Sequence, residues 1–357
     1  MKIFLISNMY PSSKDPLFGV FVKNFKLLLE KHRVIFSAVS VIKGKRDNKF
    51  SKLFSYSIYY ISISYNYFFK EYDLLYVHYL SHNSPILALL LLKKRKPLVI
   101  NVHGTDIFSS QGKKIDQVNV HVLKKTDLIV VPSLYFQNIM LINYPFLKPY
   151  NIFVSPSAGV DMTKFYLLPP NINATPILGL ISRIDAGKGW EDFLSALNIL
   201  KNRGIKFKAI IAGQGLEEKQ MLTMINNLNL SEDVEFLGLV KQNQLVHLYN
   251  KMDAMVFPTK KEESLGLVGL EAMSCKTPVI GSDIAGLKTY IKHNENGLLF
   301  TPGNVNELAE NIEKYLKFSA EKKKEMMEAA YATSQEYEAK RVISNLHNRL
   351  LELCTEK

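Results

Sequence analysis

The 357 residues are too many for one ordinary core and predict two domains, and 47% hydrophobic with 22% charged residues is the composition of a soluble globular protein. Two cysteines, Cys275 and Cys354, exclude a disulfide framework and a thiolate metal site, and we expect both to be reduced in the cytoplasm. Residues 1–165 carry 22 Lys and Arg against 9 Asp and Glu, whereas residues 166–357 carry 23 against 24, so an anionic surface or partner is expected for the first half only.

The chain opens with a predicted strand, a loop and a helix. Lys2–Met9 has the composition of a buried strand, and Phe18–His32 has apolar residues at helical spacing. Polar residues follow the strand at once, so we expect no signal peptide, and the longest strongly apolar run, Ile86–Leu92, is far shorter than the roughly 20 residues of a membrane span. Gly19 lies where the helix begins and is either a turn residue or a ligand contact. The absence of G-x-G-x-x-G argues against a dinucleotide-binding dehydrogenase.

An aromatic segment in the first half has two interpretations. After a second strand at Val34–Val41 and a basic loop at Lys43–Lys52, Phe54–Phe69 is dense in Tyr and Phe. It is either a strand or helix packed on the core, or a basic-aromatic surface that lies on anionic headgroups beneath a membrane. Nucleic acid is a weaker candidate partner, because Gly-rich and Arg-rich repeats are absent.

Short apolar runs at Leu74–Val77, Leu98–His103 and Asp127–Val131 are separated by segments of helix length, the pattern of a parallel sheet built from βαβ units. His103, followed by Gly104, Thr105 and Asp106, comes at the end of the second run. Ligands of open α/β sheets bind beyond the carboxyl ends of the strands. A lone histidine is usually structural, but this position favours a site role for His103.

A second α/β series follows a further strand at Asn151–Val154 and a stretch at Tyr166–Thr175 whose Pro and Asn content is typical of an interdomain linker. Its predicted strands end in glycine or polar residues, as a ligand-binding edge requires, and are Ile177–Ser182, Phe207–Ala212, Val234–Leu237 and Ala254–Val256. Gly213 and Gly238 directly follow two of these strands.

The loop after the first strand of this series carries Arg183 and Lys188. A guanidinium binds phosphate oxygens in a forked geometry and an ammonium acts as a point charge, so the two cations can hold a diphosphate. Taken alone, a solvated surface pair would be the better interpretation. The chemistry of a later stretch favours the diphosphate.

That stretch is Thr259–Asp283, TKKEESLGLVGLEAMSCKTPVIGSD. We expect a polar loop, a helix over Leu265–Cys275 and a short buried strand from Pro278. Gly266 falls in the first turn of the helix, where the missing side chain lets a ligand approach the backbone N–H groups. Helix N-termini favour anions, phosphates above all.

Two carboxylates, Glu263 and Glu271, lie eight residues apart around this helix start. They would repel a bare phosphate and need neutral hydroxyls as hydrogen-bond donors. A diphosphate flanked by hydroxyl-rich rings satisfies both requirements. The pattern therefore predicts a site for a nucleotide-sugar.

The end of the chain is predicted to be helical and amphipathic over Glu307–Leu351, with Ser319–Lys324 as a charged loop or frayed end. We expect residues 334–357 to form a helix that packs toward the first domain. The predicted domains are residues 1–165 and 176–333, joined by the linker at 166–175.

These residues resemble the retaining glycosyltransferases of family four, of the bacterial surface-polysaccharide type. The resemblance rests on ESLGLVGLEAM with Glu263 and Glu271, on Arg183-x4-Lys188, and with less specificity on His103-Gly-Thr-Asp and the opening YPSSKDPLFGVFVKN. It implies the GT-B fold, an α/β architecture of two facing Rossmann-like domains with parallel sheets, in which the first domain binds the acceptor and the second the nucleotide-sugar.

The resemblance also implies roles for individual residues. Arg183 and Lys188 would hold the donor diphosphate and stabilise the charge that develops on the leaving group. Glu271 would accept from the ribose hydroxyls, Glu263 would contact hydroxyls of the transferred sugar, and His103 would lie at the reactive face of that sugar. The remaining donor contacts would be mostly backbone, at Gly19, Gly213, Gly238, Val240, Gly266, Leu267 and Val268.

The implied reaction transfers a hexose or N-acetylhexosamine, from a uridine diphosphate donor on family frequency, to a hydroxyl of a glycan or lipid-linked acceptor with retention of configuration. The chain has no Asp-x-Asp pair, so we expect no metal and no cofactor. We expect a cytoplasmic protein, with anionic membrane as a candidate partner of the first domain. The alternatives are a nucleotide-sugar epimerase of the same fold and a non-catalytic basic module that binds membrane or nucleic acid.

Overall fold

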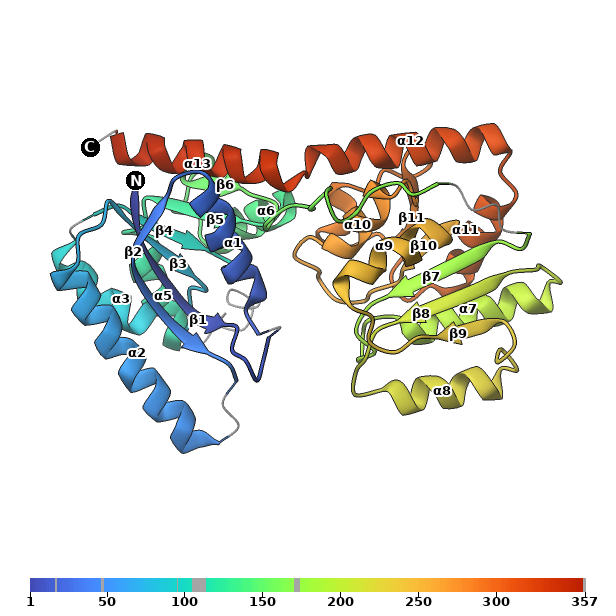
Figure 1. The fold of residues 1–357 in the computed structure, drawn as a ribbon, viewed down its shortest axis with the longest axis horizontal. Coiled ribbons are helices and arrows are strands. Elements are labelled where there is room, and N and C mark those ends of the chain that lie inside the picture. The colour runs from blue at the N-terminus through green and yellow to red at the C-terminus, as the bar shows by residue number, and fades with distance from the viewer. Residues whose placement is uncertain (17, 46–47, 95, 105–113, 170–173, 356–357) are drawn as a thin grey trace. The chain divides into compact units, whose positions relative to one another are not determined.

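The structure is a computed structural model that describes residues 1–357 except 17, 46–47, 95, 105–113, 170–173 and 356–357 (Figure 1). The chain forms two compact units by its internal contacts. Unit 1 comprises Met1–Ala158 with Lys340–Lys357, and unit 2 comprises Gly159–Ala339. Each unit is built on a six-stranded parallel sheet with helices packed on it, so the predicted α/β class with two parallel sheets is confirmed.

The sheet of unit 1 has the strand order β2-β1-β3-β4-β5-β6, and every neighbouring pair is parallel. Its strands are β1 (Lys2–Tyr10), β2 (Ile35–Lys43), β3 (Leu74–His78), β4 (Leu98–Asn101), β5 (Leu128–Val131) and β6 (Ile152–Val154). The described helices between and after them are α1 (Val20–Lys31), α2 (Lys49–Phe69), α3 (Ser84–Leu90), η1 (Leu91–Lys93), α5 (Lys114–Leu123), α6 (Leu134–Asn143), η2 (Pro149–Asn151) and α13 (Ala339–Thr355).

Successive side chains of β1 point to opposite faces of the sheet and so pack into two different cores of unit 1. Phe4 and Ile6 point into the core that α2, α3, α5 and α6 cover, whereas Ile3 and Leu5 point into the core that α1 and α13 cover. All four side chains are fully buried. A sheet covered on both faces needs such continuous apolar strands, which is why the sequence shows unbroken apolar runs there.

The sheet of unit 2 has the order β12-β11-β10-β7-β8-β9, again with every neighbouring pair parallel. Its strands are β7 (Ile177–Ile181), β8 (Lys208–Ala212), β9 (Val234–Phe236), β10 (Ala254–Phe257), β11 (Val279–Ser282) and β12 (Gly297–Phe300). Its helices are α7 (Trp190–Asn202), α8 (Glu218–Asn227), α9 (Gln242–Lys251), α10 (Leu267–Ser274), η3 (Leu287–Thr289), α11 (Val305–Leu316) and α12 (Ala320–Glu336).

The aromatic segment predicted at Phe54–Phe69 is part of helix α2, which begins earlier, at Lys49. Asn48 caps the helix, and its side chain accepts a hydrogen bond from the Ser51 N–H at 2.6 Å. The last four residues of the predicted basic loop, Lys49–Lys52, are therefore helical. Over the residues that the structure describes, no helix has both the length and the apolar character needed to cross a membrane.

Two predictions near the C-terminus are wrong. Ser319–Lys324 is not a loop, because Ser319 caps α12 and accepts from the Lys322 N–H. The last helix starts at Ala339 rather than at residue 334, because Glu336 ends α12 and a backbone pairing interrupts the helical path. In that pairing Val160 donates its N–H to the Tyr337 carbonyl at 2.8 Å, and Ala339 donates to the Val160 carbonyl at 2.9 Å.

Candidate functional site

The strand order of unit 2 creates a switch point between β7 and β10. The chain leaves β7 toward β8 on one side, whereas β10 lies on the other side of β7 in the sheet. In open parallel sheets ligands bind in the crevice beyond the carboxyl ends of such a pair, because the following loops diverge there. The loop after β7 carries Arg183 and Lys188, and the loop after β10 carries Glu263.

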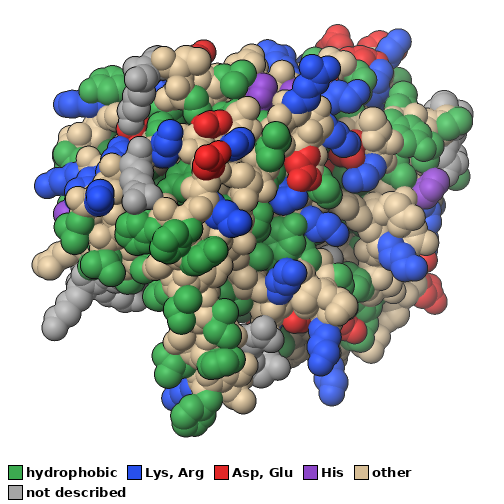
Figure 2. Space-filling model, turned by 60° about the vertical axis from the view of Figure 1, so that its left-hand side comes forward, with side chains coloured by type: hydrophobic (Ala, Val, Ile, Leu, Met, Phe, Trp, Pro, Cys, Tyr) green, Lys and Arg blue, Asp and Glu red, His purple; other side chains and the backbone are tan. Residues whose placement is uncertain are grey.

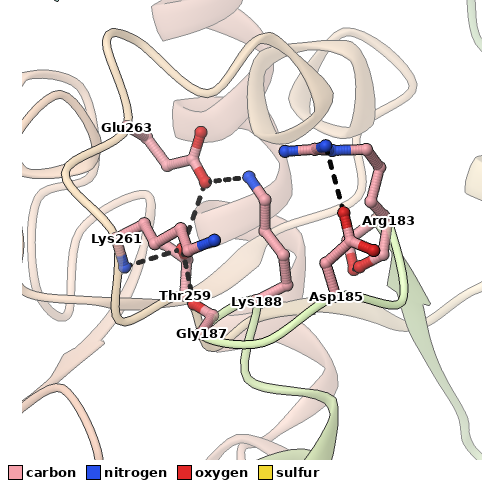
Figure 3. A network of polar contacts seen from close by, with 8 residues as sticks. Arg183, Asp185, Gly187, Lys188, Thr259, Lys261 and Glu263 are labelled. Carbon is pink, nitrogen blue, oxygen red and sulfur yellow. Dashed lines mark hydrogen bonds and ion pairs between the residues drawn. The ribbon is translucent and has the colours of Figure 1, made fainter. Parts of the chain in front are cut away.

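An ion pair joins these two loops. Lys188 Nζ lies 2.6 Å from Glu263 Oε1, and the two side chains are only 14% and 18% exposed (Figure 3). The pair joins residues 75 positions apart in the sequence. Since an ammonium has three donors, Lys188 can keep this contact and also donate to a phosphate oxygen. Glu263 likewise has a second oxygen that can accept from a hydroxyl.

Thr259, which the sequence reasoning missed, supports the ion pair. Its side chain is fully buried, and its hydroxyl lies 3.1 Å from Glu263 Oε1 and 3.4 Å from the Gly187 carbonyl. The Lys261 N–H donates to the same hydroxyl at 3.2 Å. Thr259 therefore helps to fix the orientation of the Glu263 carboxylate. Its place two residues after a buried strand was the signal that could have found it.

The guanidinium of Arg183 is held by one ion pair, and most of the side chain is exposed. Its Nη1 lies 3.0 Å from Asp185 Oδ2, and the side chain is 68% exposed. Asp185 is itself fixed, since its Oδ1 accepts from the Leu216 N–H at 3.0 Å. In Figure 3 the guanidinium of Arg183 and the ammonium of Lys188 extend from their loop to the same side. The structure thus brings the two predicted cations together on one loop.

Gly266 is the N-cap residue of helix α10 and has φ of 78°, in the left-handed region. A Cβ there would lie 2.9 Å from the Phe257 ring and 3.0 Å from Leu287, so glycine is required both by backbone conformation and by space. The N–H groups of Leu267 and Val268 belong to the first turn, where they have no intrahelical acceptor. Tyr290 fixes this end by donating its hydroxyl to the Gly266 carbonyl at 3.1 Å.

Glu271 lies one turn further along α10. The Tyr249 hydroxyl donates to Glu271 Oε2 at 2.9 Å. Burial of the carboxyl group raises the pKa of Glu271 to about 7, although the bond from Tyr249 and the charge of Lys164 act to lower it. The carboxyl group is enclosed even though the residue as a whole is half-buried. A hydroxyl donor from a ligand would favour the charged form of this group.

The raised pKa of Glu271 predicts a pH-dependent stability. The folded protein keeps a proton on Glu271 that the unfolded chain, with an ordinary pKa of 4.5, has released. The unfolding free energy of the wild type is therefore expected to fall relative to Glu271→Gln as pH rises from 4.5 to 7, and to level off above 7. Urea unfolding of both proteins across this range checks the prediction. If the unfolding free energy of the wild type stayed constant relative to that of Glu271→Gln, or rose with pH, the assigned environment of Glu271 would be contradicted.

Gly213, Gly238 and Val240 lie along the neighbouring strand ends. Gly213 has φ of 148°, and a Cβ on it would lie 1.7 Å from the Ser182 carbonyl oxygen, so packing of β8 against β7 alone accounts for this glycine. Its N–H donates to the Gly238 carbonyl at 2.8 Å, which brings those two predicted residues together. A Cβ on Gly238 would meet nothing within 4 Å. Val240 packs against the core that contains Tyr249.

The two predicted residues of unit 1 lie at the carboxyl edge of its sheet. Gly19 precedes α1 with φ of 68°, and a Cβ there would lie 2.6 Å from the Met9 backbone carbon, so glycine is required by the close crossing of β1. The ring of Phe21, in the first turn of α1, lies 4.8 Å from the ring of His103. Thr105 and Asp106 of the predicted motif lie outside the described residues.

His103 has a partner that the sequence reasoning missed. His78 Nδ1 lies 3.0 Å from His103 Nε2, and burial lowers the pKa of His103 to about 3 and that of His78 well below its ordinary value. Both rings are therefore neutral at physiological pH, and the pair fixes the orientation of His103. The signal was available, because His78 ends β3 and His103 follows the end of the neighbouring strand β4 by two residues.

The geometry thus yields two groups of predicted residues. In unit 2, Arg183, Lys188 and Glu263 surround the switch point, with the start of α10 and Glu271 on the β10 side. In unit 1, Gly19 and His103 share one sheet edge. Cations, a helix N-terminus and two acids around one strand pair can bind a diphosphate with hydroxyl-bearing groups on either side.

Comparison with known proteins agrees with this description. The family model "Glycosyl transferases group 1" matches residues 170–333, and "Glycosyl transferase 4-like" matches residues 30–133. The chain is 28% identical over 262 residues to N-acetyl-alpha-D-glucosaminyl L-malate synthase of Bacillus anthracis, over 69% of this chain and 65% of that protein. It is 26% identical over 168 residues to the capsular polysaccharide biosynthesis glycosyltransferase CapM of Staphylococcus aureus, over 45% and 44%. The matched stretches thus span less than two thirds of either relative.

Solved structures show the same fold. The structure of Alr3699/HepE from Anabaena in complex with UDP aligns with a TM-score of 0.77 at 22% identity, over 99% of this chain and 100% of that one. The two parallel sheets and this alignment define the GT-B fold. Within that fold class, residues 170–333 match the group 1 glycosyl transferases and residues 30–133 match the glycosyl transferase 4-like proteins.

Proposed function

We propose that the protein transfers a sugar from a nucleotide-diphosphate donor to a hydroxyl of a glycan or lipid-linked acceptor, with retention of configuration. The observation that carries the proposal is the Lys188–Glu263 pair across the switch point of unit 2. It sets a cation suited to phosphate beside an acid suited to sugar hydroxyls. Glu271 and the first turn of α10 extend the same pattern toward the ribose and the diphosphate.

In the proposed step, the bond between the sugar C1 and the diphosphate oxygen breaks, and the acceptor oxygen bonds to C1 from the same face. The acceptor proton passes to the departing phosphate, so no protein nucleophile is required. Lys188 and Arg183 stabilise the negative charge that grows on the diphosphate. We also propose His103, whose ring is neutral, as a hydrogen-bonding group for a substrate hydroxyl at the sheet edge of unit 1.

We propose that the reaction needs no metal, because Arg183 and Lys188 take the charge-neutralising role. Transfer is expected to proceed at an unchanged rate in excess EDTA, measured as nucleoside diphosphate released in the presence of acceptor. Loss of activity in EDTA and its return on addition of Mg²⁺ would contradict this proposal.

Uridine diphosphate is the proposed nucleotide and a hexose or N-acetylhexosamine the proposed sugar. The UDP complex of HepE and the names of the matched transferases support this choice. The name of CapM supports a role in polysaccharide assembly. We place the protein in the cytoplasm, at the inner face of the membrane, where lipid-linked acceptors of such assembly would be reached.

An acceptor-dependence assay separates the proposal from its nearest rival. A panel of nucleotide-sugars is first screened by thermal shift, since a bound donor raises the melting temperature. The stabilising donor is then incubated with and without alcohol acceptors. Release of nucleoside diphosphate only with an acceptor supports transfer, whereas conversion of the donor sugar to an epimer without acceptor would favour an epimerase of the same fold.

A further inference from the structure

Helix α2 presents apolar side chains on two opposite faces. Its inner face packs Tyr59, Ile63 and Tyr67 into the core of unit 1. Its outer face carries large apolar side chains that are between 41% and 86% exposed, namely Phe50, Leu53, Phe54, Ile58, Ile61, Tyr65, Phe68 and Phe69. Core contacts account for only one of these two apolar faces, and an exposed apolar face of this size marks a surface that binds a partner or a membrane.

The outer side chains form one continuous stripe. Their spacing of three and four residues over the length of the helix places them on one side, which we call the α2 stripe. Near the C-terminal end, Ile61, Tyr65, Phe68 and Phe69 line a shallow, open groove. In Figure 2, hydrophobic side chains crowd the projecting lower part of the face, where the N-terminal end of α2 lies in Figure 1.

Lysines lie near both ends of α2. Before and in the first turn of α2, the exposed lysines are Lys43 at the end of β2, Lys45, Lys49 and Lys52. Near the other end, Lys70, Lys93 and Lys96 are exposed. The Tyr67 hydroxyl donates to the Lys93 carbonyl at 2.9 Å, which places that segment beside the helix. No acidic residue occurs within α2, and the nearby Glu71 is paired with Lys2 at 3.1 Å.

The apolar α2 stripe and the lysines near its ends together favour one binding partner for this surface. An apolar stripe flanked by lysines is the pattern of a helix that lies in the interface of a bilayer with anionic lipids. Symmetric pairing with a second copy of this chain would bring the same lysines face to face, and like charges oppose such pairing. We propose that α2 lies in the interfacial region of an anionic membrane, with the α2 stripe buried among the acyl chains.

The inner face of α2 connects this surface to the sheet edge that holds His103. The Tyr59 hydroxyl donates to Asn83 Oδ1 at 2.6 Å, and Asn83 Nδ2 donates to the His78 carbonyl at 3.0 Å. When α2 is bound to a membrane, these hydrogen bonds therefore keep the carboxyl edge of the unit 1 sheet, with His103, near the headgroups. Resting on the proposed function, this placement selects a lipid-linked acceptor over a soluble glycan.

Vesicle sedimentation of the full chain without donor tests the membrane contact. The wild type is expected to bind phosphatidylcholine vesicles containing about a third phosphatidylglycerol at least about tenfold more tightly than pure phosphatidylcholine. The variant Phe54→Ser/Ile58→Ser/Ile61→Ser is expected to lose on the order of 100-fold in partitioning. A matched control, Leu134→Ser/Ile142→Ser on the exposed surface of α6, is expected to bind as the wild type does.

Several outcomes would overturn the proposal. Equal binding to neutral and anionic vesicles would remove the role of the lysines, and binding by the stripe variant equal to the wild type would remove the role of α2. A wild-type dimer that becomes monomeric in the stripe variant, with no vesicle binding, would assign the surface to a second copy. UDP binding should be unchanged in the stripe variant, so failure of membrane binding with intact transfer refutes only this inference.

Discussion

Replacing Lys188 by alanine is expected to lower kcat/KM for sugar transfer by roughly 10²–10³-fold, the loss typical when one donor to a developing negative charge is removed. Lys188 lies 2.6 Å from Glu263 and is mostly buried, so water cannot readily replace its charge. Release of nucleoside diphosphate in the presence of acceptor measures the effect. Glu263→Ala is likewise expected to abolish transfer, because the sugar hydroxyls lose their acceptor.

Controls separate this loss from a folding defect. Lys201→Ala removes a lysine that is also ion-paired, at 2.8 Å from Asp233, but lies on the far end of α7 and is 41% exposed. It should leave transfer unchanged. Because Lys188→Ala leaves the Glu263 carboxylate without its cation, the double variant with Glu263→Gln should recover stability but not activity. Equal transfer by the Lys188 and Lys201 variants would contradict the role assigned to Lys188, and absence of transfer in the wild type would favour a non-catalytic module.

Gly189→Ala is expected to lower the unfolding free energy of unit 2 by more than about 2 kcal/mol. Gly189 has φ of 83°, which costs an alanine about 1–2 kcal/mol, and a Cβ would lie 1.8 Å from the Pro258 carbonyl oxygen, which adds at least about 1–3 kcal/mol of overpacking. The contact joins the loop after β7 to the end of β10, so the substitution also separates Lys188 from Glu263.

Urea unfolding followed by tryptophan fluorescence measures this effect, because Trp190 is the one tryptophan of the chain and is buried in unit 2. Gly204→Ala is the matched control. Gly204 also has a positive φ of 71°, but a Cβ there would meet nothing within 4 Å, so only the backbone cost of about 1–2 kcal/mol remains. Equal losses in the two variants would show that the close approach to Pro258 is unimportant.

The fold was readable from the sequence because its strands are buried on both faces and therefore appear as unbroken apolar runs between segments of helix length. Strand bounds were recovered to within a few residues, as Pro278–Gly281 against Val279–Ser282 illustrates. The C-terminal errors have a clear cause. The charged run at Ser319–Lys324 was interpreted as solvated loop, but a helix can be solvated too, and Lys322 and Glu325 pair on its surface at 3.3 Å.

The site was only partly readable. Arg183, Lys188, Glu263 and Glu271 stood out by residue type and spacing, yet the contact between Lys188 and Glu263 depends on β7 lying beside β10, which no local pattern reveals. Thr259 could not be picked out by residue type, because a threonine is not distinctive in a sequence. Its role depends on its burial beside Glu263, which only the fold shows. The two interpretations of Phe54–Phe69 were not exclusive, since core contacts occupy one face of α2 and leave the other exposed.

A crystal structure of the protein with UDP tests the central claim most directly. We expect the diphosphate about 3 Å from Lys188 Nζ and from the guanidinium of Arg183, near the first-turn N–H groups of α10, with the ribose hydroxyls donating to Glu271. A nucleotide bound away from the carboxyl ends of β7 and β10, or one that contacts Arg183 but leaves Glu271 on an unrelated surface, would contradict the account.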